Sequence, residues 1–258
     1  MCPIIIQKIL SIVIKVWYYF AMKYENIIKG KFIERPNRFV AVVEVEGDLH
    51  KVHVKNTGRC RELLVPGAMV YLEDFIDRMG SRKMRFSLVG VEKVTDEKAI
   101  LINMDSQAPN KVVKEALEDG KLQLPGLDKL SEIKWEAKYG DSRLDFYVKD
   151  INGKEAYAEV KGVTLENKGL ASFPDAPTER GIKHLYELLK AKEEGMEAYA
   201  IFVIQMKGVT SFSPNDERHK AFGDALRDVA SKGVHVIALD CKVTEDTLQI
   251  DNTVNVNL

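Results

Sequence analysis

Two short strands decide the fold of this chain, Ser142-Arg-Leu-Asp-Phe-Tyr-Val148 and Ala156-Tyr-Ala-Glu-Val-Lys161, and the turn Asp150-Ile-Asn-Gly153 connects them. Apolar and aromatic runs around a turn that contains Gly predict an antiparallel hairpin. Alternate residues of a strand point to the same face of a sheet, so Glu159 and Lys161 share a face. These ionisable groups lie inside otherwise apolar strands, which is unusual for residues without a function.

Asp145 of the first strand joins that face only in one register. Directly opposed residues of antiparallel strands lie on the same side of the sheet, so pairing Asp145 with Glu159 requires a loop with an odd number of residues, such as 151–153. A two-residue Asn-Gly turn would send the two carboxylates to opposite faces. In the odd-loop register their β-carbons lie about 5 Å apart.

Two carboxylates at that separation indicate a divalent metal site. They repel each other unless a cation lies between them, and hard oxygen ligands suit Mg²⁺ or Mn²⁺. A neighbouring ammonium such as Lys161 can position a nucleophile or neutralise a phosphoryl group in the transition state. The pattern is what a metal-dependent phosphodiesterase would use, and the alternative is an exposed hairpin face with an ordinary Lys-Glu pair.

Around the hairpin, the hydrophobic period alternates between that of helices and that of strands. The run 111–120 places apolar residues on one helical face and ends on Gly, which predicts a helix. Glu115 on this helix is a candidate third metal ligand, with a solvated helix residue as the alternative. The remaining predicted elements are strands at about 132–139, 142–149 and 155–165, a helix over 178–194, a strand over 198–205, a helix over 216–232 and a strand over 234–240. This order predicts a mixed sheet flanked by helices.

Between Phe32 and about Leu101 the pattern is one of short strands and turns, which predicts a compact β-barrel of the OB type. Residues 31–85 carry 11 Lys and Arg against 8 Asp and Glu. From charge alone, a solvated barrel surface is the favoured explanation of so small an excess, with a nucleic-acid-binding face as the alternative.

The segment Pro177-Thr-Glu-Arg-Gly-Ile-Lys-His184 predicts the start of the second helix, with Thr178 as its N-cap. Free backbone amides at such a helix start, with Arg180, Lys183 and His184 within two turns, could form a phosphate-binding site. The alternative is an ordinary cap with basic residues facing water. His184 is expected to be a structural or phosphate contact rather than a metal ligand, because no second histidine lies at helical spacing from it.

Composition limits the class of protein. The 258 residues carry 38 Lys and Arg against 39 Asp and Glu, a net charge of −1, which excludes a disordered chain, a collagen and a multi-pass membrane protein. Cys2, Cys60 and Cys241 are far apart and form no C-x-x-C pair, so we expect neither a disulfide framework nor a thiolate zinc site. The odd count fits a reducing cytoplasm, and we expect a cytoplasmic protein.

Several ordered motifs together resemble the sugar fermentation stimulation protein family (SfsA). The resemblance covers nearly everything from Met22 onward. The motifs are Glu34-Arg-Pro-Asn-Arg-Phe39, Asn56-Thr-Gly-Arg59, Glu62-Leu-Leu-Val-Pro-Gly67, Ser142-Arg-Leu-Asp-Phe146, Glu159-Val-Lys-Gly-Val-Thr164 and Phe173-Pro-Asp-Ala-Pro-Thr-Glu-Arg-Gly-Ile-Lys-His-Leu185.

The resemblance implies a mixed α/β protein that binds DNA. An OB-like domain over 22–105 would precede a domain over 106–258 with a central mixed sheet, similar to the PD-(D/E)xK nucleases. By this analogy Asp145 and Glu159 match the metal-binding positions, Lys161 matches the catalytic lysine, and Glu115 matches a first-helix carboxylate more loosely. The Pro-Asp string of the nuclease name is absent, since Leu144 precedes Asp145.

With the family in mind, we expect contacts to DNA from both domains. In the barrel, Asn-Thr-Gly could equally be a tight turn, and Phe39, the nearest aromatic, could be a core residue. The nucleic-acid-binding candidates are Arg35, Arg38, Asn56, Thr57, Arg59, Arg143, Thr178, Arg180, Lys183 and His184.

The sequence is compatible with three functional hypotheses. The leading hypothesis is a nuclease that uses Mg²⁺ or Mn²⁺ on single- or double-stranded DNA with low sequence specificity. The second is a non-catalytic, sequence-tolerant DNA-binding regulator of sugar metabolism genes, although no helix-turn-helix pattern is present. A carbohydrate enzyme is disfavoured by the adjacent lysine and the hairpin geometry. We expect no membrane partner, and the sequence leaves a homodimer open.

The first residues differ from the rest, and they generate the first prediction. Residues 3–22 form the one long apolar stretch, and Gln7, Lys8, Ser11 and Lys15 interrupt it, so it suits neither a single-span helix nor a signal peptide. We predict that residues 1–21 are an untranslated apolar leader and that translation begins at Met22, with a membrane anchor or an extra helix as alternatives. The intact mass of the natively expressed protein should correspond to a chain without residues 1–21, and a species that carries Met1 would contradict this.

Overall fold

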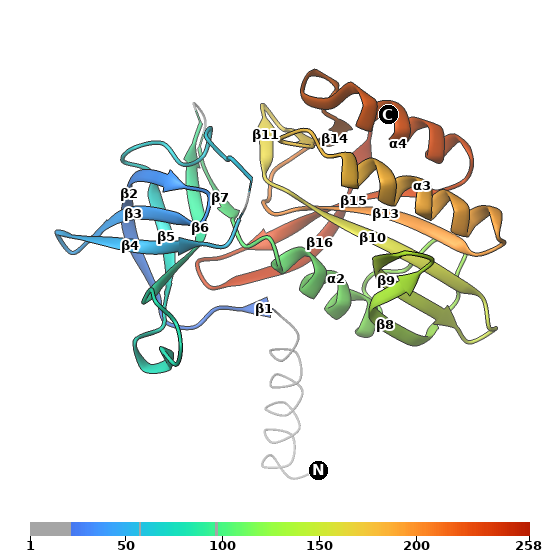
Figure 1. Cartoon of the computed structure of the whole chain (residues 1–258), viewed down its shortest axis with the longest axis horizontal. Helices are drawn as coiled ribbons and strands as arrows, with labels where there is room; N and C mark the ends of the chain where they lie inside the picture. Colours follow the sequence, from blue (N-terminus) through green and yellow to red (C-terminus); the bar gives the residue numbers. More distant parts are fainter. Residues whose placement is uncertain (1–21, 57, 96–97) are drawn as a thin grey trace, which may run out of the picture.

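The computed structural model describes residues 22–56, 58–95 and 98–258, and two domains lie side by side in it (Figure 1). The first is a β-barrel with strand order β4-β3-β2-β5-β6-β7, closed by a parallel pairing between β4 and β6. Its elements are β2 (Ile27–Asn37), β3 (Val40–Val45), β4 (Asp48–Val54), β5 (Met69–Asp74), the 3₁₀ helix η2 (Ile76–Arg78), β6 (Phe86–Val94) and β7 (Ala99–Asn103).

The second domain is a mixed sheet with helices on both faces. Its strand order is β11-β12-β14-β16-β15-β13-β10-β9-β8, and α3 and α4 pack together on the face opposite α2. Its strands are β1 (Met22–Lys23), β8 (Leu130–Tyr139), β9 (Ser142–Asp150), β10 (Glu155–Val163), β11 (Leu165–Asn167), β12 (Leu170–Phe173), β13 (Glu197–Ile204), β14 (Ser211–Pro214), β15 (His235–Val243) and β16 (Thr247–Val256). Its helices are α2 (Ala108–Glu118), α3 (Glu179–Glu193) and α4 (Asp216–Ser231).

This architecture confirms the predicted fold class, an OB-like barrel followed by an α/β domain with a central mixed sheet. The predicted hairpin, the three helices and the strands β13 and β15 are all present. The short strands β11, β12 and β14 were not predicted, because three or four residues carry little periodicity. The polar strand β16 was also missed, since its apolar residues are sparse.

The start of the described chain belongs to the second domain rather than to the barrel. β1 pairs antiparallel with β16, with Met22 opposite Leu248, so the predicted barrel range 22–105 includes two residues of the other sheet. The predicted leader 1–21 lies outside the described residues. None of the helices in the described ranges combines the length and the apolarity needed to cross a membrane.

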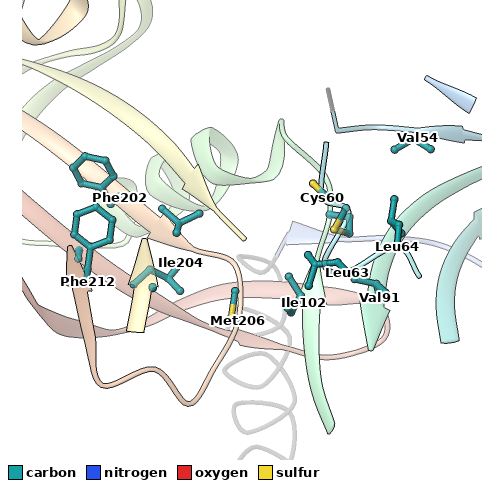
Figure 2. Close-up of a cluster of buried hydrophobic side chains, with 14 of the residues drawn as sticks. Val54, Cys60, Leu63, Leu64, Val91, Ile102, Phe202, Ile204, Met206 and Phe212 are labelled. Atoms are coloured by element: carbon teal, nitrogen blue, oxygen red, sulfur yellow. The ribbon is translucent and has the colours of Figure 1, made fainter. Parts of the chain in front are cut away.

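A continuous hydrophobic core joins the two domains. Figure 2 shows Met206 between Ile204 and Phe212 of the sheet domain and Ile102 and Leu63 of the barrel side, and all five side chains are buried. Burial of apolar surface is worth about 25 cal/mol per Å², so this shared core favours one fixed arrangement of the domains.

Buried polar contacts fix the same interface. Lys55 of the barrel places its Nζ 3.2 Å from Asp105 Oδ2, and Gln205 of the sheet domain donates from Nε2 to the Asp105 carbonyl at 3.0 Å. Lys93 of β6 places its Nζ 2.5 Å from Glu166 Oε2 on β11. Buried charges need such partners, and here the partners come from opposite domains. Asp105 lies three residues before α2, so the interface also fixes where that helix starts.

The ends of the central strands far from the barrel are held together by Glu197 at the start of β13. Its carboxylate receives Lys154 Nζ at 2.8 Å, Lys192 Nζ at 2.5 Å and His235 Nε2 at 3.1 Å. Burial by itself raises the pKa of Glu197, but the hydrogen bonds from the two lysines and the histidine outweigh it and lower the pKa from 4.5 to about 2. The cluster ties the hairpin loop, α3 and β15 together.

Replacing Glu197 by Gln should destabilise the protein in a pH-dependent way. Because the folded pKa of about 2 lies below the unfolded value of 4.5, the stabilisation is complete above pH 4.5 and disappears as pH falls towards 2. We expect Glu197→Gln to lower the free energy of unfolding by roughly 1–3 kcal/mol at pH 7, with a smaller difference below pH 4.5. Urea denaturation of the wild type and of Glu197→Gln from pH 3 to 7 measures this difference in unfolding free energy. A difference that does not change with pH would contradict the lowered pKa of Glu197.

Candidate functional site

The hairpin of β9 and β10 adopts the register that an odd-numbered loop requires, with the Asp145 side chain bound by α2 and the Glu159 side chain bound by α3. Tyr147 lies opposite Tyr157, and Phe146 lies opposite Ala158, so one further step places Asp145 opposite Glu159. The loop has three residues, since Asp150 N donates to Lys154 O at 3.0 Å. The odd-loop register is therefore confirmed.

Asp145 lies where the two strands separate. Its Oδ2 accepts a hydrogen bond from Val160 N at 2.7 Å, and its Oδ1 accepts one from Asn110 Nδ2 of α2 at 2.7 Å. Burial, together with the nearby charge of Glu159, raises the pKa of Asp145 despite these two hydrogen bonds. The side chain is thus held rigidly between a strand and a helix.

Glu159 is buried, with 4% of its surface exposed, and its two oxygens differ. Oε1 accepts hydrogen bonds from Lys161 Nζ and from His184 Nδ1, whereas Oε2 has no hydrogen-bond partner within the described residues. Burial raises the pKa of Glu159, but the hydrogen bond from His184 and the charge of Lys161 outweigh it, so the net pKa is lowered. Glu159 is therefore held as a carboxylate with one free oxygen.

The first turn of α3 lies over this face of the hairpin. Thr178 caps the helix, because its hydroxyl accepts a hydrogen bond from Gly181 N at 3.1 Å, which confirms the predicted N-cap. The cap sets the phase of the helix and places His184 against Glu159, while Arg180 Nε donates to His184 Nε2 at 3.3 Å. His184 is buried and Arg180 is exposed.

Lys183 and Arg143 lie on the exposed surface around this cluster. Lys183 Nζ is 3.6 Å from Glu187 Oε1, and Arg143 Nη1 is 3.7 Å from Glu136 Oε2, so both are engaged in weak surface ion pairs. Within the described residues neither forms a hydrogen bond or an ion pair with Asp145 or Glu159, and each stays a prediction as a nucleic-acid contact.

Glu115 does not join the pair, which corrects the expectation of a third carboxylate. Its Oε2 accepts a hydrogen bond from Met22 N at 3.0 Å, and burial raises its pKa. Residues five apart on a helix are about 140° apart around its axis, so Glu115 faces away from Asn110, the α2 residue that contacts Asp145. In the described ranges no group of three or more His, Cys, Asp or Glu side chains could hold a metal ion. The pair that remains has hard oxygen ligands, and the free Glu159 Oε2 fits a divalent cation.

In the barrel, Arg35 has a structural role, and its contact to DNA stays a prediction. Its guanidinium donates to four backbone carbonyls, at 2.8 Å to Gly58, 2.8 Å to Arg59, 2.7 Å to Arg38 and 2.6 Å to Asn56. These bonds connect the β2–β3 turn to the loop after β4, and they leave few donors for a ligand.

The Asn56 side chain is also committed, since its Oδ1 accepts from Gly58 N at 2.8 Å in a tight turn. This was the alternative interpretation of the Asn-Thr-Gly motif. Thr57, predicted as a contact, lies outside the described residues. The β2–β3 turn and the turn after β4 border a hollow of about 310 Å³. Its lining is rich in arginine and consists of Arg35, Asn37, Arg38, Gly58, Arg59, Arg61 and Leu64.

Arg38, Arg59 and Arg61 make no ion pair with any carboxylate of the described chain, so this hollow is positively charged. Phe39 beside it is 45% exposed and is not a core residue, and Arg38 Cζ lies 4.8 Å from the centre of its ring. The hollow adjoins the second domain, because a Cβ added to Gly58 would lie 2.5 Å from Asp175 Oδ2, three residues before the cap of α3.

Two residues of these sites were not predicted. Arg61 was counted only in the charge excess, and its position after Arg59 is the signal that could have found it. Asn110 carries no signal in the sequence, because its contact to Asp145 depends on how α2 packs on the sheet.

The chain matches two family models. Residues 33–102 match the SfsA N-terminal OB domain, and residues 107–247 match the sugar fermentation stimulation protein RE domain. It is 53% identical over 237 residues to the sugar fermentation stimulation protein homolog of Clostridium beijerinckii, which covers 92% of this chain and 100% of the relative. The homolog of Desulfitobacterium hafniense is 50% identical over 237 residues, 92% of this chain and 99% of the relative.

The chain is also similar to a solved structure, that of Pyrococcus furiosus SfsA in complex with Ca²⁺. The TM-score is 0.80 and the sequence identity is 26%, and the match covers 92% of this chain and 98% of the chain in that structure. The similarity therefore extends over both domains.

Arg35→Lys should destabilise the barrel, because one ammonium cannot replace a guanidinium that donates to four carbonyls. We expect a loss of about 1–3 kcal/mol in the free energy of unfolding. Arg61→Lys, in the same hollow, is the matched control and should change it by less than about 0.5 kcal/mol. Chemical denaturation of the three proteins measures this, and equal stability of the two variants would contradict the structural role of Arg35.

Proposed function

The chain belongs to the sugar fermentation stimulation protein family, and on this premise we propose that it is a DNA-binding protein whose nuclease-like domain hydrolyses phosphodiester bonds with Mg²⁺ or Mn²⁺. The observation that carries the proposal is the pair of the half-buried Asp145 and the buried Glu159, with a free Glu159 oxygen and the Lys161 ammonium beside it.

Burying two carboxylates side by side is unfavourable without a cation. Lys161 supplies one positive charge for two negative ones, so the cluster lacks a second cation. The related Pyrococcus furiosus structure is one of a complex with Ca²⁺, an ion that takes oxygen ligands as Mg²⁺ does. We infer that Asp145 and Glu159 Oε2 are ligands of a divalent ion.

A bound divalent ion would supply an activated water and would stabilise charge on a phosphoryl oxygen. The residues of the chain hold the other parts of the reaction. Lys161 Nζ is placed by its hydrogen bond to Glu159 Oε1, and from there it can orient the nucleophile and offset charge on the pentavalent phosphorus. Asn110 and Val160 N keep the Asp145 carboxylate fixed.

The barrel hollow supports the DNA-binding part of the proposal. Arg38, Arg59 and Arg61 can bind backbone phosphates, and the exposed Phe39 can stack on a base. Because the Gly58 loop touches the segment before α3, a strand held in the hollow would continue towards Thr178 and Arg180. Contacts of this kind are mainly to the backbone, so we expect low sequence specificity.

Cleavage assays of the full chain on supercoiled, single-stranded and branched DNA, with Mg²⁺, Mn²⁺ or chelator, test this function. Wild type should cut with metal only. Asp145→Asn and Lys161→Ala should each reduce cutting by at least about 100-fold while mobility shifts show unchanged binding. Asp141→Asn, an exposed carboxylate in the turn before β9, is the control and should cut normally.

Binding to DNA without cutting on any substrate, in wild type and variants alike, would contradict the catalytic part of the proposal. That result would favour the non-catalytic DNA-binding regulator. A failure to bind DNA would contradict both.

A further inference from the structure

The hydrogen bonds of Glu159 leave one defined oxygen free. Oε1 accepts from two donors, whereas Oε2 is buried with no partner in the part of the chain that the structure describes. A carboxylate can exchange its oxygens by rotating about its last side-chain torsion, which has a broad energy profile. The donors on Oε1 therefore decide which oxygen faces the site.

His184 is the donor that comes from outside the hairpin. Its side chain is 7% exposed, and its Nδ1 contacts Glu159 Oε1. If Nδ1 donates, the neutral ring has an acceptor at Nε2, and Arg180 Nε donates to that atom at 3.3 Å. A second proton on Nε2 would face the Arg180 donor, so this contact favours the tautomer that serves Glu159.

We propose that His184 and Arg180 form a positioning pair, in which Arg180 fixes the tautomer of His184 and His184 holds Glu159 with Oε2 free for a divalent cation. This inference rests on the proposed function. Partners that orient a metal-binding side chain typically contribute about 10-fold to 100-fold to metal affinity. Neither residue is itself proposed as a metal ligand.

Arg180 adds a connection to the substrate. It is exposed in the first turn of α3, and its Nη groups have no hydrogen bond or ion pair within the described ranges. Those groups can bind a phosphate while Nε still contacts His184. The pair would therefore link a bound DNA phosphate to the orientation of Glu159.

Direct binding of Mn²⁺ alone to the full-length protein, followed by electron paramagnetic resonance or calorimetry, tests the inference without requiring cleavage. His184→Ala should weaken Mn²⁺ binding by about 10-fold or more. His184→Asn should restore it to within about 3-fold of wild type, because the Asn amide nitrogen can donate from nearly the position of Nδ1. Arg180→Gln should weaken binding less than His184→Ala, since His184 remains.

Lys190→Gln is the matched control, on the exposed side of the same helix with its ammonium 3.9 Å from Glu194. It should leave Mn²⁺ affinity unchanged. Circular dichroism and thermal unfolding without metal establish that each variant is folded, and rescue by Asn separates positioning from a loss of packing.

The outcomes distinguish this inference from the function on which it rests. Unchanged Mn²⁺ affinity in His184→Ala, with binding abolished in Asp145→Asn, would overturn the positioning pair alone. An equal loss in His184→Ala and His184→Asn would also overturn it. A wild-type protein that binds no Mn²⁺ would overturn both.

Discussion

The Asp145 carboxylate accepts the hydrogen bond of Val160 N, which in a regular hairpin would go to a backbone carbonyl of β9. The pairing of β9 with β10 ends at Phe146 and Ala158, while β10 continues against β13 as far as Val163. Because the strands separate at this point, side chains from the two flanking layers can reach the gap. Asn110 enters from α2 and His184 from α3, and both contact one of the two carboxylates.

This arrangement accounts for how the buried Glu159 and the half-buried Asp145 remain near each other. A buried charge is tolerated when hydrogen bonds and opposite charges replace the water that it has lost. Asp145 receives two donors, one of them a backbone amide, and Glu159 receives an ammonium and an imidazole on one oxygen. The remaining Glu159 oxygen is the one uncompensated position of the pair, which is why we assign a cation to it.

Contacts at the domain interface fix the position of α2, the helix that supplies Asn110 to the site. Lys55 and Gln205 hold Asp105, which precedes α2, and Gly162 is so close to Pro109 that a Cβ added to it would lie 2.8 Å from the Pro109 ring. The start of α2, and with it Asn110, is thus fixed by contacts from both domains. The barrel places its arginine-rich hollow next to the segment that leads into α3.

The sequence predicts those features that depend on residues close together in the chain, and it misses those that depend on contacts between distant segments. The parity of a hairpin loop relates Asp145, Glu159 and Lys161 through local geometry alone, and the cap at Thr178 is equally local. The contact of Asn110 with Asp145, the hydrogen bonds of Arg35 to four carbonyls and the hydrogen bond of Glu115 with Met22 depend on packing between distant segments, which no short-range pattern encodes. Strand β16 was missed because its own hydrophobic pattern is weak, and pairing with the neighbouring strand β15 stabilises it.

A crystal structure with Mn²⁺, with the ion located by its anomalous scattering, would test the central claim most directly. The account predicts one ion bound by an oxygen of Asp145 and by Glu159 Oε2, with Oε1 still accepting from Lys161 and His184. An ion bound elsewhere, or a Glu159 that binds it through Oε1 after releasing His184, would contradict the account.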